Sequence, residues 1–249
     1  MSQQSLVILF FCIILAWEYY LPNDKDVVVD QRWVSNFSLT LITTLIVILL
    51  GDYIPNYALN GEVILQVSRV SLVDLTLYFV LLLFIDFVFY LLHRASHFVE
   101  LLWKLHRVHH SDPHMDVSTH FRHHPLEYIW VFSLFSFLVW LLEIPVVVVA
   151  LYFVLATLIQ MWHHANIRVG QRVESLIGII FITPTMHRVH HQQSWKESNS
   201  NFGAVFCFWD RIFRTFILDN QNYNNFGIQG FTSKKQQSLT RLIKQPFTK

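Results

Sequence analysis

Long apolar stretches alternate with polar segments along the chain, and each is long enough to cross a hydrocarbon core of about 30 Å as a helix. The stretches are residues 5–21, 36–53, 71–92 and 127–162. The last is about twice the length of one crossing, and Glu143 and Pro145 lie at its middle. We therefore expect a helical hairpin of two short spans that turns at these two residues.

The first stretch, residues 5–21, begins without a basic segment and ends without a small-residue cleavage site. These features favour a retained span over a signal peptide. A helix lying in the membrane interface is the alternative for this stretch.

The number of crossings predicts which polar segments share a face of the membrane. If the third span ends at His93 and the hairpin leaves and returns, residues 93–126 and 163–249 lie on the same side. All 14 histidines fall in these two segments, and of the 18 lysines and arginines only Arg69 lies on the opposite side. Because loops rich in Lys and Arg stay inside, we expect the histidine side to be cytoplasmic.

Composition agrees with an integral membrane protein, because 53% of the 249 residues are hydrophobic and only 14% are charged. The two cysteines, Cys12 and Cys207, do not form a disulfide framework and fit a reducing compartment. A net charge of +1 argues against a nucleic-acid partner, and no glycine-rich nucleotide-binding motif occurs. Nothing in the sequence predicts an oligomeric state.

The predicted fold class is therefore all-α, with about four or five transmembrane helices and a cytoplasmic helical cap. Residues 1–70 are expected to hold N-terminal transmembrane helices, 71–220 a catalytic domain, and 221–249 a polar, basic tail. That tail could lie against anionic headgroups or be a solvated end.

Histidines recur in the polar segments at spacings that place them on one face of a helix. The sequence HRVHH occurs twice, and a third HxxHH and the pair HRASH add to it. The clustered histidines are His93, His97, His106, His109, His110, His120, His123, His124, His163, His164, His187, His190 and His191. Neutral imidazole is a common ligand of transition metals, and so many imidazoles exceed the coordination of one ion. The pattern predicts a site for two metal ions, from which His114 stands apart.

Two carboxylates are spaced to support such ligands, since ligating imidazoles commonly donate their second N–H to a carboxylate or carbonyl. Asp86 precedes His93 by seven residues on the same helical face, and Glu127 follows His124 by three. The alternatives are an aspartate at a span end that reaches water and a glutamate that complements the dipole of a helix beginning at Pro125.

The ordered motifs between Asp86 and Phe216 resemble the fatty acid hydroxylase/sterol desaturase superfamily of membrane di-iron oxygenases, and most of all its bacterial sterol desaturase-like branch. The matching segments read HRASH, LHRVHHSD, FRHHPLE, HHANIR, TPTMHRVHH and SNFGAVFCFWDRIFRTF. One departure is Arg214, where the family usually has glycine.

The resemblance implies a centre of two iron ions held by ten histidines. These are His93, His97, His106, His109, His110, His124, His164, His187, His190 and His191. It makes His120, His123 and His163 neighbours of the ligands. We expect Asp86, Glu127 and Asn201 to lie behind the ligating rings and support them. The resemblance also implies O2 as co-substrate, a membrane lipid as substrate, and two electrons from a separate donor protein. Hydroxylation and desaturation of a C–H bond both remain open, as does the identity of the lipid.

Two other classes are compatible with parts of this pattern. A histidine-rich membrane metal transporter or metal-binding protein would explain imidazoles and spans, but transporters place their ligands near the bilayer midplane. A membrane anchor with degenerate motifs is disfavoured by the completeness of the ten positions.

Overall fold

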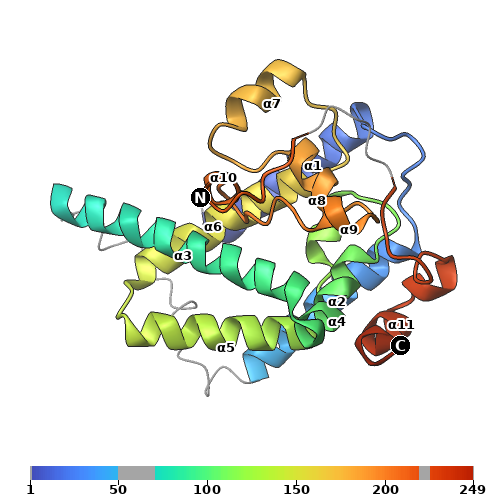
Figure 1. Cartoon of the computed structure of the whole chain (residues 1–249), viewed down its shortest axis with the longest axis horizontal. Helices are drawn as coiled ribbons and strands as arrows, with labels where there is room; N and C mark the ends of the chain where they lie inside the picture. Colours follow the sequence, from blue (N-terminus) through green and yellow to red (C-terminus); the bar gives the residue numbers. More distant parts are fainter. Residues whose placement is uncertain (1, 50–70, 219–224, 249) are drawn as a thin grey trace.

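The computed structural model describes residues 2–49, 71–218 and 225–248, which form helices joined by turns and loops (Figure 1). Within these ranges no strand is present beyond isolated bridges, so the predicted all-α class is confirmed. Four helices are long and apolar enough to cross a membrane. They are α1 (Gln3–Tyr20), α2 (Gln31–Leu49), α3 (Leu72–Phe98) and α6 (Val146–His164). Arg69 and the end of the second predicted stretch, residues 50–53, lie outside the described ranges.

Helix α3 carries the first histidine pair beyond the end of its predicted span. It begins with a capping box, in which Ser71 and Asp74 each bond the other's backbone N–H. Its 27 residues extend about 40 Å at 1.5 Å per residue, more than a bilayer core needs. The last turns, with His93 and His97, therefore project past the apolar part of the helix.

The predicted hairpin is present as α5 (Pro125–Leu141) and α6. Glu143 lies in the connecting turn with φ of 50°, and Pro145 caps the start of α6. Helices α3, α5 and α6 lie side by side (Figure 1) and share a buried apolar core. That core is built from residues including Ile85, Phe135, Val139, Val148, Val149, Tyr152 and Ala156.

Short helices form a cap at the end of this bundle where the histidines lie. They are α4 (Glu100–His110), η2 (Val117–Phe121), α7 (Gln171–Ile177), α8 (Pro184–His190), α9 (Trp195–Ser198), α10 (Phe208–Ile212), η3 (Lys234–Gln237), α11 (Leu239–Lys244) and η4 (Gln245–Phe247). Helix α4 follows α3 after a single residue.

A buried charge network, the Arg32 network, joins the start of α2 to the loop after α4. Arg32 is 1% exposed and donates to the carboxylates of Asp112, at 3.0 Å, and Asp116. Arg122 lies 4.0 Å from Asp112 and donates to the side-chain oxygen of Asn36. Burial alone would raise the pKa of the Asp112 carboxyl, but the guanidiniums of Arg32 and Arg122 hold that pKa below its usual value.

The C-terminal segment packs on the cap along residues 225–248. Leu242 is fully buried against Leu39 of α2 and Val108 of α4. The side-chain oxygen of Gln245 accepts a hydrogen bond from Ser111. Figure 1 shows α11 beside α2 and α4. The segment therefore braces the helix that carries the first HRVHH motif.

Replacing Leu242 by alanine should lower the free energy of unfolding by about 2–5 kcal/mol, as deletion of a buried leucine side chain does. Thermal unfolding in detergent measures the change. Phe247→Ala is the control, because Phe247 is 73% exposed, and we expect it to change stability by less than about 0.5 kcal/mol. Equal effects of both substitutions would contradict the bracing role of Leu242.

Arg214, the position at which the resemblance leads one to expect glycine, has φ of 58°. Glycine adopts this left-handed region without steric cost, whereas other residues do not. A glycine at this position, as the resemblance implies for the family, would adopt this conformation without that cost.

Candidate metal centre

Two groups of histidines converge at the junction of the bundle and the cap. The five-histidine group is His93, His97, His106, His110 and His190. The four-histidine group is His109, His164, His187 and His191. Within each group the ligand atoms lie within 4.8 Å of one another. Nine of the ten predicted ligands are therefore brought together, in two groups as a pair of metal ions requires.

The helices α4 and α8 each serve both groups. Spacing i, i+4 on α4 sends His106 and His110 to the five-histidine group, while His109 between them reaches the other. Around α8 the division is inverted, because His187 and His191 join the four-histidine group and His190 the first. In each copy of HRVHH the first and last histidines therefore join one group and the fourth residue joins the other, and the two groups are exchanged between the copies.

Backbone carbonyls fix the orientation of several rings. His93 directs Nδ1 to the carbonyl of Phe202 at 2.9 Å, and His190 directs Nδ1 to that of Ser200 at 2.7 Å. His164 does the same with Gln160 at 2.8 Å. Since a carbonyl only accepts, each Nδ1 carries the proton, and in the neutral ring Nε2 is left with a bare lone pair.

Bare lone pairs then face each other at close range. The Nε2 atoms of His93 and His106 are 3.1 Å apart, and Nδ1 of His106 is turned to the carboxylate of Glu127 at 2.6 Å. The Nε2 atoms of His109 and His164 are 3.2 Å apart, and Nδ1 of His109 faces the carbonyl of Arg122. Two such pairs repel unless a cation lies between them, so the donor set fits metal ions.

Unpartnered nitrogens support the same conclusion. Both ring nitrogens of His97 and Nε2 of His190 are buried without a hydrogen-bond partner among the described residues, and buried polar atoms rarely remain so. Burial lowers the pKa of His110, His190 and His191 well below the usual value, and neighbouring imidazoles lower it further. These rings are neutral, which is the form that binds metal.

Glu127 orients the ring of His106, a member of the five-histidine group. One carboxylate oxygen contacts Nδ1 of His106 at 2.6 Å, and the other contacts Nδ1 of His123 at 3.2 Å. The ring of His123 is stacked on that of His109 with centroids 4.3 Å apart. Glu127 thus links rings that border both groups.

His124, the tenth residue of the expected ligand set, lies outside both groups. It is the N-cap of α5, where its Nδ1 accepts from the N–H of Leu126, while Nε2 faces the carbonyl of Ile243. Pro125 at the first helical position places the preceding side chain at the helix end. The structure brings His123, its neighbour in the sequence, to the site instead.

Neither Asp86 nor Asn201 forms a hydrogen bond with a grouped histidine within the described ranges. Both instead bond to backbone groups of the loops around the site. Asp86 accepts from the side chains of Tyr152 and Trp209 and from the N–H groups of Val205 and Phe206. It therefore ties the loop after the SNFG motif to α3 and α6.

Asn201, with φ of 52°, donates to the carbonyls of Met186 and Ile217. Asp210, which sequence reasoning did not single out, accepts from the N–H groups of Phe202 and Gly203. These contacts hold the carbonyls that orient His93 and His190. The only sequence signal for Asp210 was its place in the final WDR motif.

The remaining histidines have different surroundings. His163 is 1% exposed, its ring lies 3.9 Å from that of His187, and neither of its nitrogens has a partner in the described part of the chain. His120 borders His164, and burial lowers the pKa of His120 to about 3. His114 stays outside both groups.

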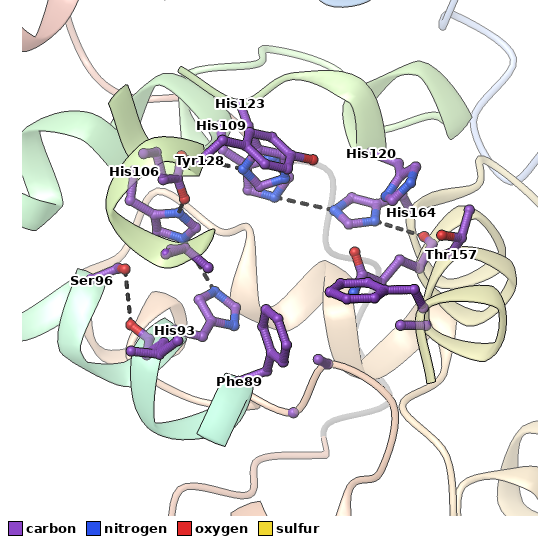
Figure 2. A pocket seen from close by; sticks show the side chains of 18 of the residues that line it. Phe89, His93, Ser96, His106, His109, His120, His123, Tyr128, Thr157 and His164 are labelled. Atoms are coloured by element: carbon purple, nitrogen blue, oxygen red, sulfur yellow. Dashed lines mark hydrogen bonds and ion pairs between the residues drawn. The ribbon is translucent and has the colours of Figure 1, made fainter. Parts of the chain in front are cut away.

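A cavity of about 260 Å³ opens beside the two groups (Figure 2). It is lined at one end by histidines of both groups, including His93, His106, His109, His164 and His187. The rest of the lining includes Phe89, Val131, Phe132, Phe153 and Ala156 of α3, α5 and α6, and Phe89 lies beside His93 (Figure 2). Tyr128, Thr157 and Gln160 also line it, with Tyr128 beside His109 and Thr157 beside His164 (Figure 2).

A sequence model described as Fatty acid hydroxylase matches residues 78–215. This segment is more than half of the chain and contains both histidine groups. The chain belongs to the fatty acid hydroxylase family. The resemblance drawn from the motifs is thereby confirmed at the level of the family, and with the four candidate spans the protein is an integral membrane protein.

Alkylglycerol monooxygenase of Homo sapiens is 32% identical over 139 residues, which are 55% of this chain and 30% of that protein. Alkylglycerol monooxygenase of Caenorhabditis elegans is 31% identical over 143 residues, 57% of this chain and 27% of that protein. Ornithine lipid hydroxylase OlsE of Rhizobium tropici is 28% identical over 166 residues, 66% of this chain and 48% of that protein. The match thus spans less than half the length of each relative. No solved structure matches the chain.

Proposed function

We propose that this member of the fatty acid hydroxylase family is a di-iron oxygenase that hydroxylates a membrane lipid. The facing lone pairs of His93 with His106 and of His109 with His164 carry the proposal, because they call for two cations beside one cavity. Two iron ions held there would activate O2, and a separate donor protein would supply the two electrons. The names of the relatives, a monooxygenase and a hydroxylase, favour oxygen insertion over desaturation.

In this proposal the chain's own residues bind the two ions and orient the lipid. The five-histidine group would hold one ion and the four-histidine group the other, with Glu127 fixing the ring of His106. The apolar lining formed by residues such as Phe89 and Phe153 would receive a hydrocarbon chain and exclude water from the reacting carbon. We place this site on the cytoplasmic face, on the charge distribution of the loops.

Three polar side chains suggest what kind of lipid the cavity accepts. Tyr128, Thr157 and Gln160 line it, and none has a side-chain hydrogen bond within the described ranges. Their polar atoms are therefore open to a group that enters the cavity. We propose that they bind oxygen or nitrogen atoms of the lipid close to the carbon that reacts, while its apolar chain occupies the part lined by phenylalanine.

Replacing Thr157 by valine should lower product formation about tenfold, as the loss of one hydrogen bond of about 1.4 kcal/mol would. Thr76→Val is the matched control, because Thr76 is exposed on α3. The measurement is the amount of oxygenated lipid in cells expressing each variant at equal level. Equal effects of both substitutions would show that Thr157 does not contact the substrate.

Comparative lipid mass spectrometry of a host with and without the intact gene tests the function itself. We expect a lipid that gains the mass of one oxygen atom when the gene is present. Loss of two hydrogen atoms would instead indicate desaturation. Metal uptake by proteoliposomes without O2 consumption on addition of host lipid would favour a transporter.

A further inference from the structure

Two indole rings connect the protein surface to the five-histidine group. Trp103 on α4 packs against the rings of His97 and His110, with centroid distances of 5.1 and 5.5 Å. Trp195, the first residue of α9, packs edge-on against Trp103 at 6.1 Å and is 58% exposed. An aromatic path therefore leads from solvent to two buried imidazoles in two contacts.

This path approaches the group on a different side from the cavity. His93 and His106 line the cavity, whereas His97 and His110 do not. Trp103 packs against the latter two, and its ring lies farther from that of His106, at 6.4 Å, while neither Trp103 nor Trp195 lines the cavity. A lipid in the cavity and a protein over Trp195 can therefore be present together without competing for space.

We propose that Trp195 and Trp103 form the route by which electrons enter the metal centre from a one-electron redox protein. This inference rests on the proposed function. His97 and His110 are 1% and 2% exposed, so a docked donor cannot touch them. Electron tunnelling weakens steeply with distance and is faster through packed atoms than through gaps, so contiguous rings supply the coupling.

The electron balance requires two visits by such a donor. In each visit the donor would lose one electron, which an ion held by the histidines would accept. Two electrons and two protons, with one O2 and one C–H bond, give one hydroxyl group on the lipid and one water.

A second exposed aromatic ring approaches His97 and provides a control. Phe98 is 58% exposed and reaches His97 through Phe202, at 6.1 and then 5.1 Å. Phe98 is the last residue of α3, one of the candidate membrane spans. Trp195 belongs to α9, outside the candidate spans, beside the exposed Lys196, where a soluble protein has access.

Stopped-flow reduction tests the route without turnover. The full chain, loaded with iron in nanodiscs, is mixed anaerobically with a reduced plant-type ferredoxin, and ferredoxin oxidation is followed by absorbance. We expect Trp195→Leu and Trp103→Leu to slow this phase by an order of magnitude, Phe98→Leu to leave it unchanged, and Trp103→Phe to restore part of the rate. Iron content should be equal in all four variants, and excess dithionite should reduce each one fully.

Wild-type rates in Trp195→Leu and Trp103→Leu with iron retained would overturn the route, and so would slowing by Phe98→Leu alone. If Trp103→Leu loses iron, Trp195→Leu decides, because Trp195 has no ring contact with a grouped histidine. A wild-type chain that binds no iron contradicts the proposed function. Iron binding with unaltered reduction in the Trp195 variant contradicts only the route.

Discussion

Replacing His190 by alanine should weaken metal binding at the five-histidine group, so that the purified protein holds fewer than two ions per chain, and abolish formation of the oxygenated lipid. His190 is fully buried, its Nε2 has no partner in the described ranges, and its Nδ1 is held by the carbonyl of Ser200. Nothing nearby replaces the lost nitrogen. Elemental analysis by mass spectrometry measures the ions per chain.

His124→Ala is the control that separates the structure from the family pattern. Because His124 lies outside both groups, we expect two ions to be retained, at a cost of about 1 kcal/mol in stability from the lost helix cap. The opposite result, in which His124→Ala loses metal and His190→Ala keeps it, would refute the two-group assignment.

Arg32→Met should lower the free energy of unfolding by about 3–5 kcal/mol, the usual effect of removing one partner from a buried ion pair. Asp112 and Asp116 are each 2% exposed. Arg122, 4.0 Å from Asp112, would be the remaining guanidinium of the Arg32 network. The negative charges of Asp112 and Asp116 would then be buried with too little positive charge beside them. Thermal or denaturant unfolding of the purified protein gives the difference.

Arg241→Met makes the same chemical change at an exposed position, and we expect it to change the free energy of unfolding by less than about 0.5 kcal/mol. A loss in Arg32→Met no larger than in this control would mean that the two aspartates take up protons or find other partners.

The apolar pattern predicted the hairpin and four helices long and apolar enough to cross a membrane, because a bilayer imposes a fixed length and internal backbone hydrogen bonding on each crossing. Glu143 and Pro145 marked the turn correctly for the same reason. Helix α5, expected as a short span, has 17 residues and is shorter than these four. The number of clustered histidines also predicted two groups, and the i, i+4 pairs fall into one group each, but His109 and His190, at i+3 of their motifs, join the opposite group.

The choice between His123 and His124 required local geometry that the family pattern did not supply. Pro125 at the first helical position makes the residue before it the cap, and a capping side chain turns back onto its own helix. His123 and Glu127, four residues apart, were the better signal.

The contacts of the polar network and of the C-terminal segment were not predictable from sequence. Arg32 meets Asp112 and Asp116 across about 80 residues of chain, and no periodicity encodes such a pairing. The basic residues of the tail suggested solvent or headgroups, whereas Leu242 and Gln245 decide its position by packing on α4. Composition reports the charged surface of a segment and says little about its few buried residues.

The sharing of α4 and α8 between the two groups has a consequence for biosynthesis. Neither group has its full set of nitrogens until α8, more than 70 residues after α4 in the sequence, has left the ribosome. The membrane helices are inserted before that point, so the ions must be delivered afterwards, from the aqueous side, to a largely assembled protein. Loading of one group then prepositions both helices for the other, and a cell starved of metal would accumulate empty and full molecules rather than half-filled ones.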